Sequence, residues 1–204
     1  MNSLDKLIEQ FEQFPGVGAR QARRFAFYVM TLPSDEVAKL AELITTIQGS
    51  VIECESCRRF FAQNGTGTLC SICSASNRDT TKLLVVERDV DIQPIERSGV
   101  YDGLYFVLGG TLPLLDKKDK QPLRSNGLKK IVTERLEHGL VEIILAFSVN
   151  PDGENTARFV EKMLSEIPGS NVATISQLGR GLSTGSELEY ADPETIKNAL
   201  QNRH

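Results

Sequence analysis

The apolar residues of the first fifty positions recur at the spacing of three amphipathic helices. The first helix is expected from Leu4 to Phe14, and the second begins near Ala19. Ser34 is expected to cap a third helix that ends at Gly49. The apolar residues are Leu4, Leu7, Ile8, Phe11 and Phe14 in the first helix, and Ala22, Phe25, Ala26, Val29 and Met30 in the second. In the third helix the face expected to be buried comprises Val37, Leu40, Ile44 and Ile47. Three helices this short would bury only a modest core.

After Thr81 the pattern changes to short apolar runs that alternate with helical segments. Strands are expected at 82–86, 105–108, 141–146 and 172–175, and helices at 90–95, 128–136, 156–164 and 193–200. Asp192 is expected to cap the last helix, with Pro193 at its first position. Alternation of this kind predicts a parallel sheet with helices on both faces, in which function gathers at the carboxyl ends of the strands.

Composition and charge add constraints on the class of protein. The chain has 204 residues, 40% of them hydrophobic, which is enough to bury a core. No apolar run approaches the roughly 18 residues of a membrane span, and the amphipathic N-terminus is not a signal peptide. We therefore expect a cytoplasmic protein with no membrane partner. The net charge of −4 opposes nucleic-acid binding through bulk charge, so any such binding requires a local basic patch.

All four cysteines lie in one stretch, arranged as two Cys-x-x-Cys pairs. A twelve-residue loop containing the turn-forming run 64–67 separates Cys54 and Cys57 from Cys70 and Cys73. This spacing predicts a structural zinc ion held by four thiolates, with no open position for water or substrate. The alternatives are buried or disulfide-bonded cysteines, and redox exchange through one pair, although no thioredoxin-like pattern surrounds either pair.

A glycine-containing turn joins the first two expected helices. Pro15 ends the first helix, and Gly16 and Gly18 permit a tight turn whose backbone N–H groups point outward together. Such a turn before a helix N-terminus suits a phosphate oxygen. Three arginines follow it, Arg20, Arg23 and Arg24, and no acidic residue occurs between positions 14 and 30. The pattern is typical of a helix-hairpin-helix that grips the nucleic-acid backbone without reading bases. The alternative is a helical hairpin whose glycines serve only the turn.

Acidic residues follow two of the expected strands. Glu87 comes directly after the first strand, with Asp89 and Asp91 close behind, while Asp152 and Glu154 follow the third strand. Carboxylates at adjacent strand ends can share a magnesium ion. The alternative is helix capping, because Asp89 and Asp152 also stand where N-terminal caps are expected.

The segment 109–126 has no expected secondary structure of its own. It contains Gly109, Gly110, two prolines and the charged run 116–120. A connection of this length is typical of a binding loop or a mobile flap.

Four motifs occur in one order along nearly the whole chain. They are the Pro-Gly-Val-Gly hairpin, the four-cysteine site, the α/β unit with an acidic strand end, and a closing Gly-x-x-Leu-Glu-Tyr-Ala-Asp at 185–192. Together they resemble the RecR family of bacterial recombination mediators. The resemblance implies a Toprim α/β domain, a homotetrameric ring or clamp, and binding of single- and double-stranded DNA without sequence preference. It also implies action with RecO and RecF in loading RecA onto single strands, and no catalysis.

The resemblance assigns roles to particular positions. Arg20 and Arg24 match basic residues of the family's hairpin that contact DNA, and the four cysteines match its zinc ligands. Glu87, Asp152 and Glu154 match Toprim acidic positions that in this family are associated with RecO binding rather than cleavage. The segment 188–192 matches a Walker-B-like stretch in the subunit-contact region.

The predicted fold class is multidomain α+β. It comprises a helix-hairpin-helix region at 1–52, a four-cysteine zinc finger at 53–76, a Toprim domain with a parallel sheet at 80–176, and a C-terminal helical, Walker-B-like segment at 177–204. The loops at 111–126 and 147–153 depart from the family's pattern. The leading function is a non-enzymatic DNA-binding mediator. The alternatives are a Toprim-type magnesium-dependent nuclease or primase-like phosphotransferase that uses Glu87, Asp152 and Glu154, and a purely protein-binding adaptor.

Overall fold

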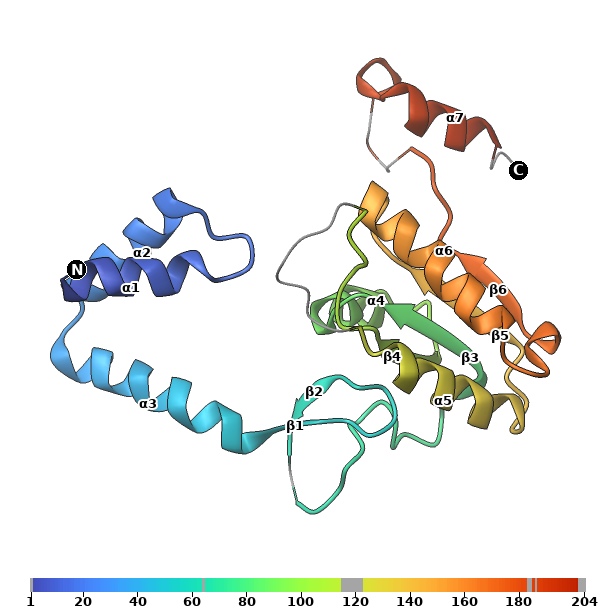
Figure 1. Cartoon of the computed structure of the whole chain (residues 1–204), viewed down its shortest axis with the longest axis horizontal. Coiled ribbons are helices and arrows are strands. Elements are labelled where there is room, and N and C mark those ends of the chain that lie inside the picture. The colour runs from blue at the N-terminus through green and yellow to red at the C-terminus, as the bar shows by residue number, and fades with distance from the viewer. Residues whose placement is uncertain (1, 64, 115–122, 183–184, 186, 202–204) are drawn as a thin grey trace. The chain divides into compact units, whose positions relative to one another are not determined.

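Helices form the N-terminal part of the chain, and a mixed arrangement of strands and helices follows (Figure 1). The computed structural model describes residues 2–63, 65–114, 123–182, 185 and 187–201. The chain divides into two compact units, Met1–Ile52 and Glu53–His204, which are described separately below.

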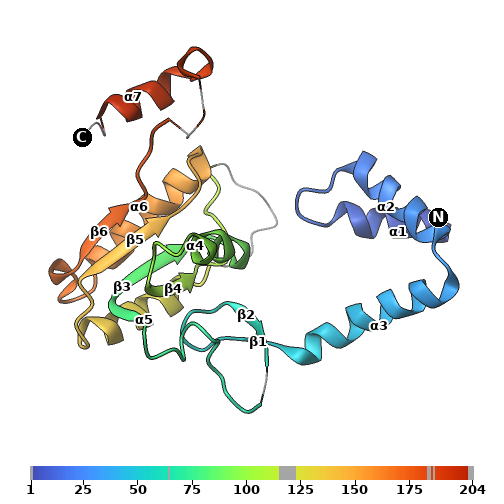
Figure 2. The same cartoon turned by 180° about the vertical axis from the view of Figure 1, so that it is seen from behind.

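The first unit contains α1 (Ser3–Glu12), α2 (Ala19–Thr31) and α3 (Ser34–Ser50). A capping box starts α1, in which the Asp5 N–H donates to Asn2 Oδ1 at 2.9 Å. Helices α1 and α2 lie side by side (Figures 1 and 2), and the Phe11 and Phe25 rings meet edge to face with centroids 5.9 Å apart. Among the described residues of this unit only Ala22 and Ala26 are buried, so its core is as small as predicted.

The apolar face of α3 is exposed in the single chain. Leu43, Ile44 and Ile47 leave 66%, 62% and 56% of their surface accessible to solvent. The prediction that this face is buried is therefore wrong for the isolated chain, because helical periodicity identifies an apolar face but not what covers it. The predicted cap is also wrong: the N-cap is Pro33, and no side chain caps the helix.

A small two-stranded sheet that the sequence pattern did not predict begins at the boundary between the two units, which falls within its first strand. Its strands are β1 (Val51–Glu53) and β2 (Phe60–Ala62). The cysteine loops adjoin these strands, and Cys54, Cys57, Cys70 and Ile72 belong to the same hydrophobic core as the larger sheet that follows.

The larger sheet has four parallel strands, as predicted. They are β3 (Asp79–Val86), β4 (Gly103–Val107), β5 (Glu142–Ala146) and β6 (Thr174–Gln177), in the order β4-β3-β5-β6. In register, Val85 lies opposite Phe106 on one side and Leu145 on the other. Every residue of β4 is buried although it is an edge strand.

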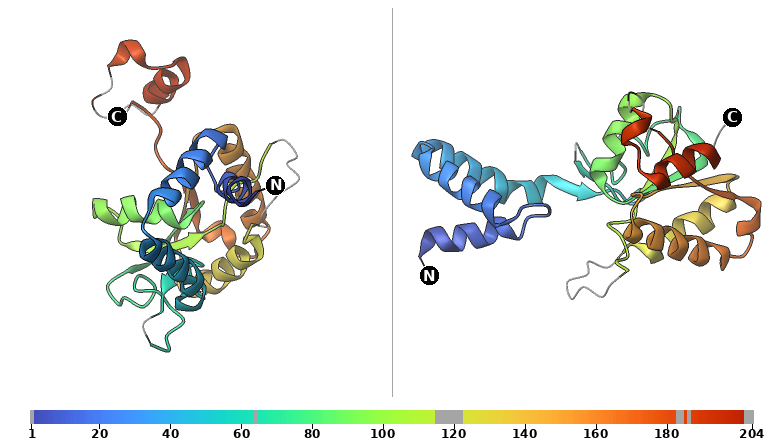
Figure 3. Two further views of the ribbon diagram at one scale, coloured as in Figure 1. Left: turned by 90° about the vertical axis from the view of Figure 1, so that its left-hand side faces the viewer. Right: turned by 90° about the horizontal axis from the view of Figure 1, so that it is seen from above.

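The helices of this unit are α4 (Ile92–Ser98), α5 (Ser125–Leu136), α6 (Pro151–Ser165) and α7 (Pro193–Gln201). The right-hand view of Figure 3 shows the sheet between α4 on one side and α5 and α6 on the other. Three short 3-10 turns cover Asp89–Asp91, Ser170–Val172 and Leu188–Tyr190. The parallel α/β arrangement with helices on both faces is confirmed.

The start of α6 differs from the prediction in a way that bears on function. Asn150 is the N-cap, its Oδ1 accepting from the Gly153 N–H at 2.8 Å, and Pro151 is the first helical residue. Asp152 and Glu154 therefore lie in the first turn of α6 and not before it. By contrast, the predicted cap of α7 is confirmed, since Asp192 Oδ1 accepts from the Thr195 N–H at 2.9 Å. Among the described helices, none combines the length and the apolar character that crossing a membrane requires.

Candidate metal centre and nucleic-acid interface

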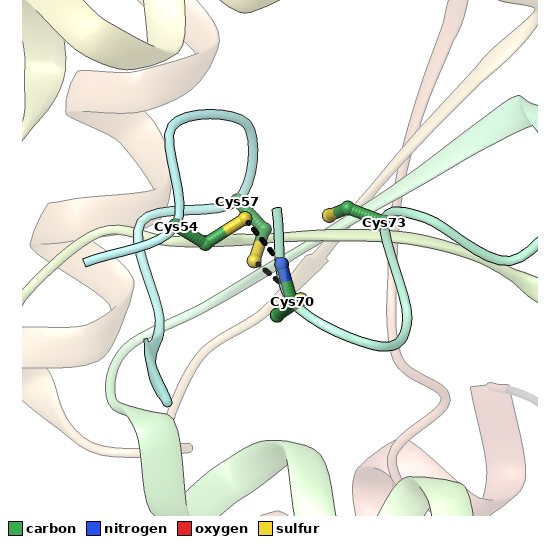
Figure 4. Close-up of side chains that lie close together, drawn as sticks. All are labelled: Cys54, Cys57, Cys70 and Cys73. Atoms are coloured by element: carbon green, nitrogen blue, oxygen red, sulfur yellow. Dashed lines mark hydrogen bonds between the residues drawn. The ribbon is translucent and has the colours of Figure 1, made fainter. Parts of the chain in front are cut away.

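Four cysteine sulfurs converge between two short loops (Figure 4). All four atoms lie within 4.8 Å of one another, and Cys57 Sγ and Cys70 Sγ are 3.6 Å apart. A tetrahedral zinc ion with Zn–S bonds of about 2.3 Å places its sulfurs about 3.8 Å apart. None of the four cysteines is in a disulfide, and three of them are buried. The donor set and its spacing fit one structural zinc ion, and the disulfide alternative is wrong.

Backbone amides and a left-handed residue shape these loops. The Cys70 N–H donates to Cys54 Sγ at 3.4 Å, and the Cys54 N–H donates to Arg59 O at 2.8 Å. Arg58 has a φ of 63°, and its N–H donates to Cys54 O at 3.0 Å, which turns the chain sharply after Cys57. The turn brings the two sulfurs of this pair to one side.

The thiols perturb one another because they are packed together. Hydrogen bonds with Cys70 and Cys73, together with burial, raise the pKa of Cys57 far above its ordinary value. Hydrogen bonds from Cys57 and Cys73 lower the pKa of Cys70 below its ordinary value. Four thiolates cannot share this space without a cation, and a divalent metal ion supplies that charge and displaces the thiol protons.

Three contacts fix the cysteine loops to the parallel sheet. The Val107 N–H of β4 donates to Cys57 O at 2.8 Å, and the Phe60 N–H donates to Asp89 Oδ1 at 2.6 Å. Arg124 Nε lies 2.7 Å from Glu53 Oε1. The loops, β1 and β2 are therefore held against the carboxyl-terminal end of the sheet. The capping prediction for Asp89 is wrong, since its carboxylate holds the Phe60 amide instead.

The turn between α1 and α2 leaves several backbone donors free. Gly16 has a φ of 79°, which favours glycine, and the Val17 N–H donates to Phe14 O at 3.0 Å. Four N–H groups here have no hydrogen-bond acceptor among the described residues. They belong to Gly16, Gly18, Ala19 and Arg20. Gly18 has an ordinary φ of −89°, and a Cβ added there would meet nothing within 4 Å. Gly16 is thus needed for the turn, whereas Gly18 keeps the space in front of the free donors open.

The three arginines of α2 stand beside this turn. Arg20, Arg23 and Arg24 are exposed, form no ion pair with any described residue, and share a helix that contains no acidic residue. Free N–H groups and unpaired guanidinium groups on one short segment are chemically suited to anions such as backbone phosphates.

The acidic residues at the strand ends hold loops in place. Glu87 is 6% exposed, and its Oε1 accepts from the Ser148 N–H at 2.5 Å. Asp152 Oδ1 accepts from the Leu114 N–H at 2.9 Å. Among the residues for which positions are given, only the cysteines form a group of three or more side chains suited to one metal ion. Glu87, Asp152 and Glu154 do not form such a group of three, and the capping prediction for Asp152 is wrong because Asn150 caps α6.

Glu154 has a basic partner that the sequence pattern did not indicate. Arg180 Nη1 donates to Glu154 Oε1 at 2.9 Å, and Arg180 Nη2 donates to Gln177 Oε1 at 3.3 Å. The only local signal was the isolated arginine between two glycines. Ser148, which holds Glu87, was missed because it binds through its backbone.

The two described ends of the segment 109–126 are tied to the sheet and to α6. The Leu112 N–H donates to Thr156 Oγ1 at 2.7 Å, and the Asn155 side chain donates to Leu112 O at 3.0 Å. At the other end the Arg124 N–H donates to Leu108 O at 2.9 Å. The charged run predicted to form a binding loop or flap falls in 115–122, outside the described residues.

Comparisons with known proteins agree with this arrangement. Family profiles match residues 4–47 as "RecR, helix-hairpin-helix", 81–175 as "Toprim domain" and 181–204 as "RecR, C-terminal". A protein of Dehalococcoides mccartyi named Recombination protein RecR is 36% identical over 201 residues, covering 98% of this chain and 93% of its own. The chain belongs to the RecR family. RecR proteins of Lactobacillus helveticus and Rubrobacter xylanophilus are 34% and 35% identical, over 97% and 98% of this chain and 94% and 96% of their own.

Membership of the RecR family gives the chain a role in DNA recombination and repair. It confirms the predicted order of a helix-hairpin-helix, a four-cysteine site, a Toprim domain and a C-terminal segment. The Toprim match spans the parallel sheet, whose strand ends carry Glu87 and the acidic first turn of α6.

Proposed function

We propose that this RecR protein is a non-enzymatic, DNA-binding mediator that acts with RecO and RecF to load RecA onto single-stranded DNA. The observation that supports DNA binding most directly is the turn between α1 and α2. It combines free N–H groups at the start of α2 with three exposed arginines that no described acid neutralises. A family name alone would not identify this surface.

The chemistry of that turn suits backbone phosphates rather than bases. The N–H groups can hold a phosphate oxygen, and Arg20 and Arg24 add charge-assisted hydrogen bonds. Contacts of this kind carry no base information, so single- and double-stranded DNA are both substrates for binding. Because each contact releases counterions, affinity falls steeply with salt.

A homotetrameric ring or clamp would reconcile this local patch with the acidic chain. One hairpin binds weakly, but several hairpins in one closed assembly raise the effective concentration of the second and later contacts. The exposed apolar residues of α3 support self-association, because a face with Leu43, Ile44 and Ile47 open to water is typical of an interface. The C-terminal segment around 188–192 would contribute further subunit contacts.

The acidic strand ends are the proposed contact surface for RecO. Glu154 and Asp152 lie in the first turn of α6, and Glu87 stands at the end of β3. In this proposal Glu87, which is buried, shapes the surface through Ser148 rather than contacting the partner directly. A structural zinc ion in the four-cysteine site would keep the finger against the sheet.

The test of DNA binding is a charge reversal in the hairpin. Arg20→Glu combined with Arg24→Glu should abolish binding of a fluorescent single-stranded oligonucleotide, measured by anisotropy across a range of salt concentrations. If each arginine meets one phosphate, neutralising both already lowers the slope of log affinity against log salt by about 1.4 per hairpin. Arg97→Glu, at an exposed arginine of α4, is the charge-matched control for each of the single reversals Arg20→Glu and Arg24→Glu.

Native mass spectrometry of the same variants separates binding from assembly. The oligomer should be unchanged in the double variant, since these side chains are exposed on α2. Undiminished DNA affinity in an intact oligomer would remove the hairpin from the mechanism. Co-precipitation with purified RecO and RecF then tests the two partners one at a time, with Glu154→Gln as the variant for the acidic surface.

The Toprim match supports one alternative, a magnesium-dependent nuclease or primase-like phosphotransferase. Incubation with labelled single- and double-stranded DNA and magnesium decides between the two. Cleavage that disappears in Glu87→Gln would establish the enzyme, and intact DNA after long incubation supports the mediator.

A further inference from the structure

Arg135 of α5 is a poorly partnered cation that lies against the cysteine loops. Its Nη2 donates to Ser56 Oγ at 3.0 Å, and Ser56 lies between Cys54 and Cys57 in the chain. Among the buried side-chain nitrogen and oxygen atoms of the described residues, only Arg135 Nη1 lacks a hydrogen-bond partner. An arginine group withdrawn from water in this way ordinarily faces a negative charge.

The negative charge available to Arg135 is that of the cysteines. Burial lowers the pKa of Arg135, and the neighbouring Cys73, Cys57, Tyr101 and Cys54 oppose that shift. Three of these four groups belong to the metal site. No carboxylate of the described residues lies within ion-pair distance of the guanidinium.

Two other arginines close to the finger are already paired. Arg58 Nη1 lies 3.7 Å from Glu53 Oε2, and Arg124 Nε lies 2.7 Å from Glu53 Oε1. Both are held by the same carboxylate, so neither is free to balance charge at the sulfurs. Arg135, by contrast, directs one donor to Ser56 in the cysteine loops and keeps a buried Nη1 donor unused.

A zinc ion bound by four thiolates retains two negative charges. Resting on the zinc site proposed above, we propose that Arg135 is the charge partner of that centre. Its positive charge and its free Nη1 donors compensate the excess negative charge of the sulfurs. Its hydrogen bond to Ser56 holds the guanidinium beside the loop between Cys54 and Cys57. Arg135 thereby couples metal binding to α5 of the Toprim domain.

This role predicts opposite effects in the two metal states. In zinc-bound protein, removing the charge leaves the centre uncompensated and weakens metal binding. In metal-free protein no zinc–thiolate centre is present, so Arg135 is a half-buried charge with a buried, unpaired Nη1 donor. Its replacement by an apolar side chain of similar length should then be neutral or stabilising.

The test compares Arg135→Met and Arg135→Lys with the exposed control Arg97→Met. Zinc affinity is measured by competition with a chromophoric chelator, and urea unfolding is measured with and without zinc. Arg135→Met should raise the zinc dissociation constant by about 10–100-fold, the usual effect of losing a group that supports metal ligands. Arg135→Lys should recover part of that loss, and Arg97→Met should match the wild type.

Cobalt substitution provides a readout that a purely structural role would not move. The thiolate-to-metal absorption bands of the Co2+ protein report charge density on the sulfurs, and they should shift in Arg135→Met but not in Arg97→Met. Unchanged zinc affinity and unchanged cobalt bands in Arg135→Met would overturn the proposal. If Arg135→Met fails to fold, the same two measurements on Arg135→Lys and Arg135→Gln decide it.

Failure of the underlying zinc site has a different signature. If the wild-type protein contains no zinc and binds none in the competition assay, the four cysteines are not a zinc site and the underlying proposal is wrong. If the wild type and Arg135→Met both bind zinc, and equally tightly, the zinc site stands and only the proposed role of Arg135 is wrong.

Discussion

Substituting two glycines at equivalent positions of two helices tests how closely the backbone is packed at the acidic strand end. Gly153 and Gly127 are each the third residue of their helix, α6 and α5. A Cβ added to Gly153 would lie 2.0 Å from the backbone oxygen of Ser148, whereas one added to Gly127 would lie 3.4 Å from Phe106 Cζ. The first distance is a clash with main chain, and the second is an ordinary contact.

The magnitude for Gly153→Ala follows from three terms. Overpacking costs about 1–3 kcal/mol, and displacing Ser148 endangers its N–H bond to the Glu87 carboxylate, which contributes about 1.5–3 kcal/mol. The higher helix propensity of alanine offsets at most about 1 kcal/mol of this loss in stability. We expect Gly153→Ala to lower the free energy of unfolding by about 2–4 kcal/mol. Gly127→Ala should leave it unchanged or raise it by up to about 1 kcal/mol.

Urea unfolding of the two variants is the assay. Gly153→Ala should unfold at a urea concentration about 1–2 M lower than the wild type, whereas Gly127→Ala should be at or slightly above it. RecO binding should fall in Gly153→Ala alone, because the turn that carries Ser148 must move. Equal midpoints for the two alanine variants would refute the reasoning that Gly153 is required by the approach of the β5–α6 turn.

Three further outcomes follow from the geometry. Gly18→Ser should leave stability unchanged, since serine is as good an N-cap, yet lower DNA affinity about 5–30-fold by occupying the free donors; anisotropy measures this, and full affinity would contradict it. The zinc dissociation constant should rise as the pH falls, because protons compete for thiols such as Cys57, whose pKa is raised; chelator competition at several pH values checks it, and a flat profile would exclude thiolate ligation. Hydrogen bonds from Thr81 and Lys82 lower the pKa of Asp79 to about 2, so its stabilising effect is present above the ordinary carboxyl pKa of about 4 and is lost between about pH 4 and pH 2. In Asp79→Asn, unfolding midpoints should lose that part of the acid dependence, and an unaltered profile would show that Asp79 does not contribute.

Local patterns predicted the order of elements because each depends on neighbours in the chain. The Asp192-Pro193 pair was correctly taken as a helix start, but the equivalent Asn150-Pro151 pair was overlooked, and α6 was begun too late. The same information was present in both places. The error came from placing the cap at an acidic residue, Asp152, when the helix had already begun.

Other features depend on contacts between distant segments, and no local pattern contains them. Arg135 resembles a solvated residue of an amphipathic helix, yet it reaches Ser56 in the cysteine loops. Asp89 resembles a helix cap, yet it holds the Phe60 amide. The apolar face of α3 could be recognised from its period, but whether this chain or another covers it depends on assembly.

The contact between the cysteine loops and β4 has a consequence for the protein without metal. The segment 103–108 is apolar, uncharged and free of proline, the composition that favours pairing between strands of different molecules. As an edge strand, β4 is shielded by Cys57, whose carbonyl occupies the Val107 N–H. Loss of the metal would free the cysteine loops and expose the edge of β4 to other molecules. The four-cysteine finger would therefore also protect the protein against aggregation. In the proposed tetramer, zinc would thereby suppress a competing route of self-association.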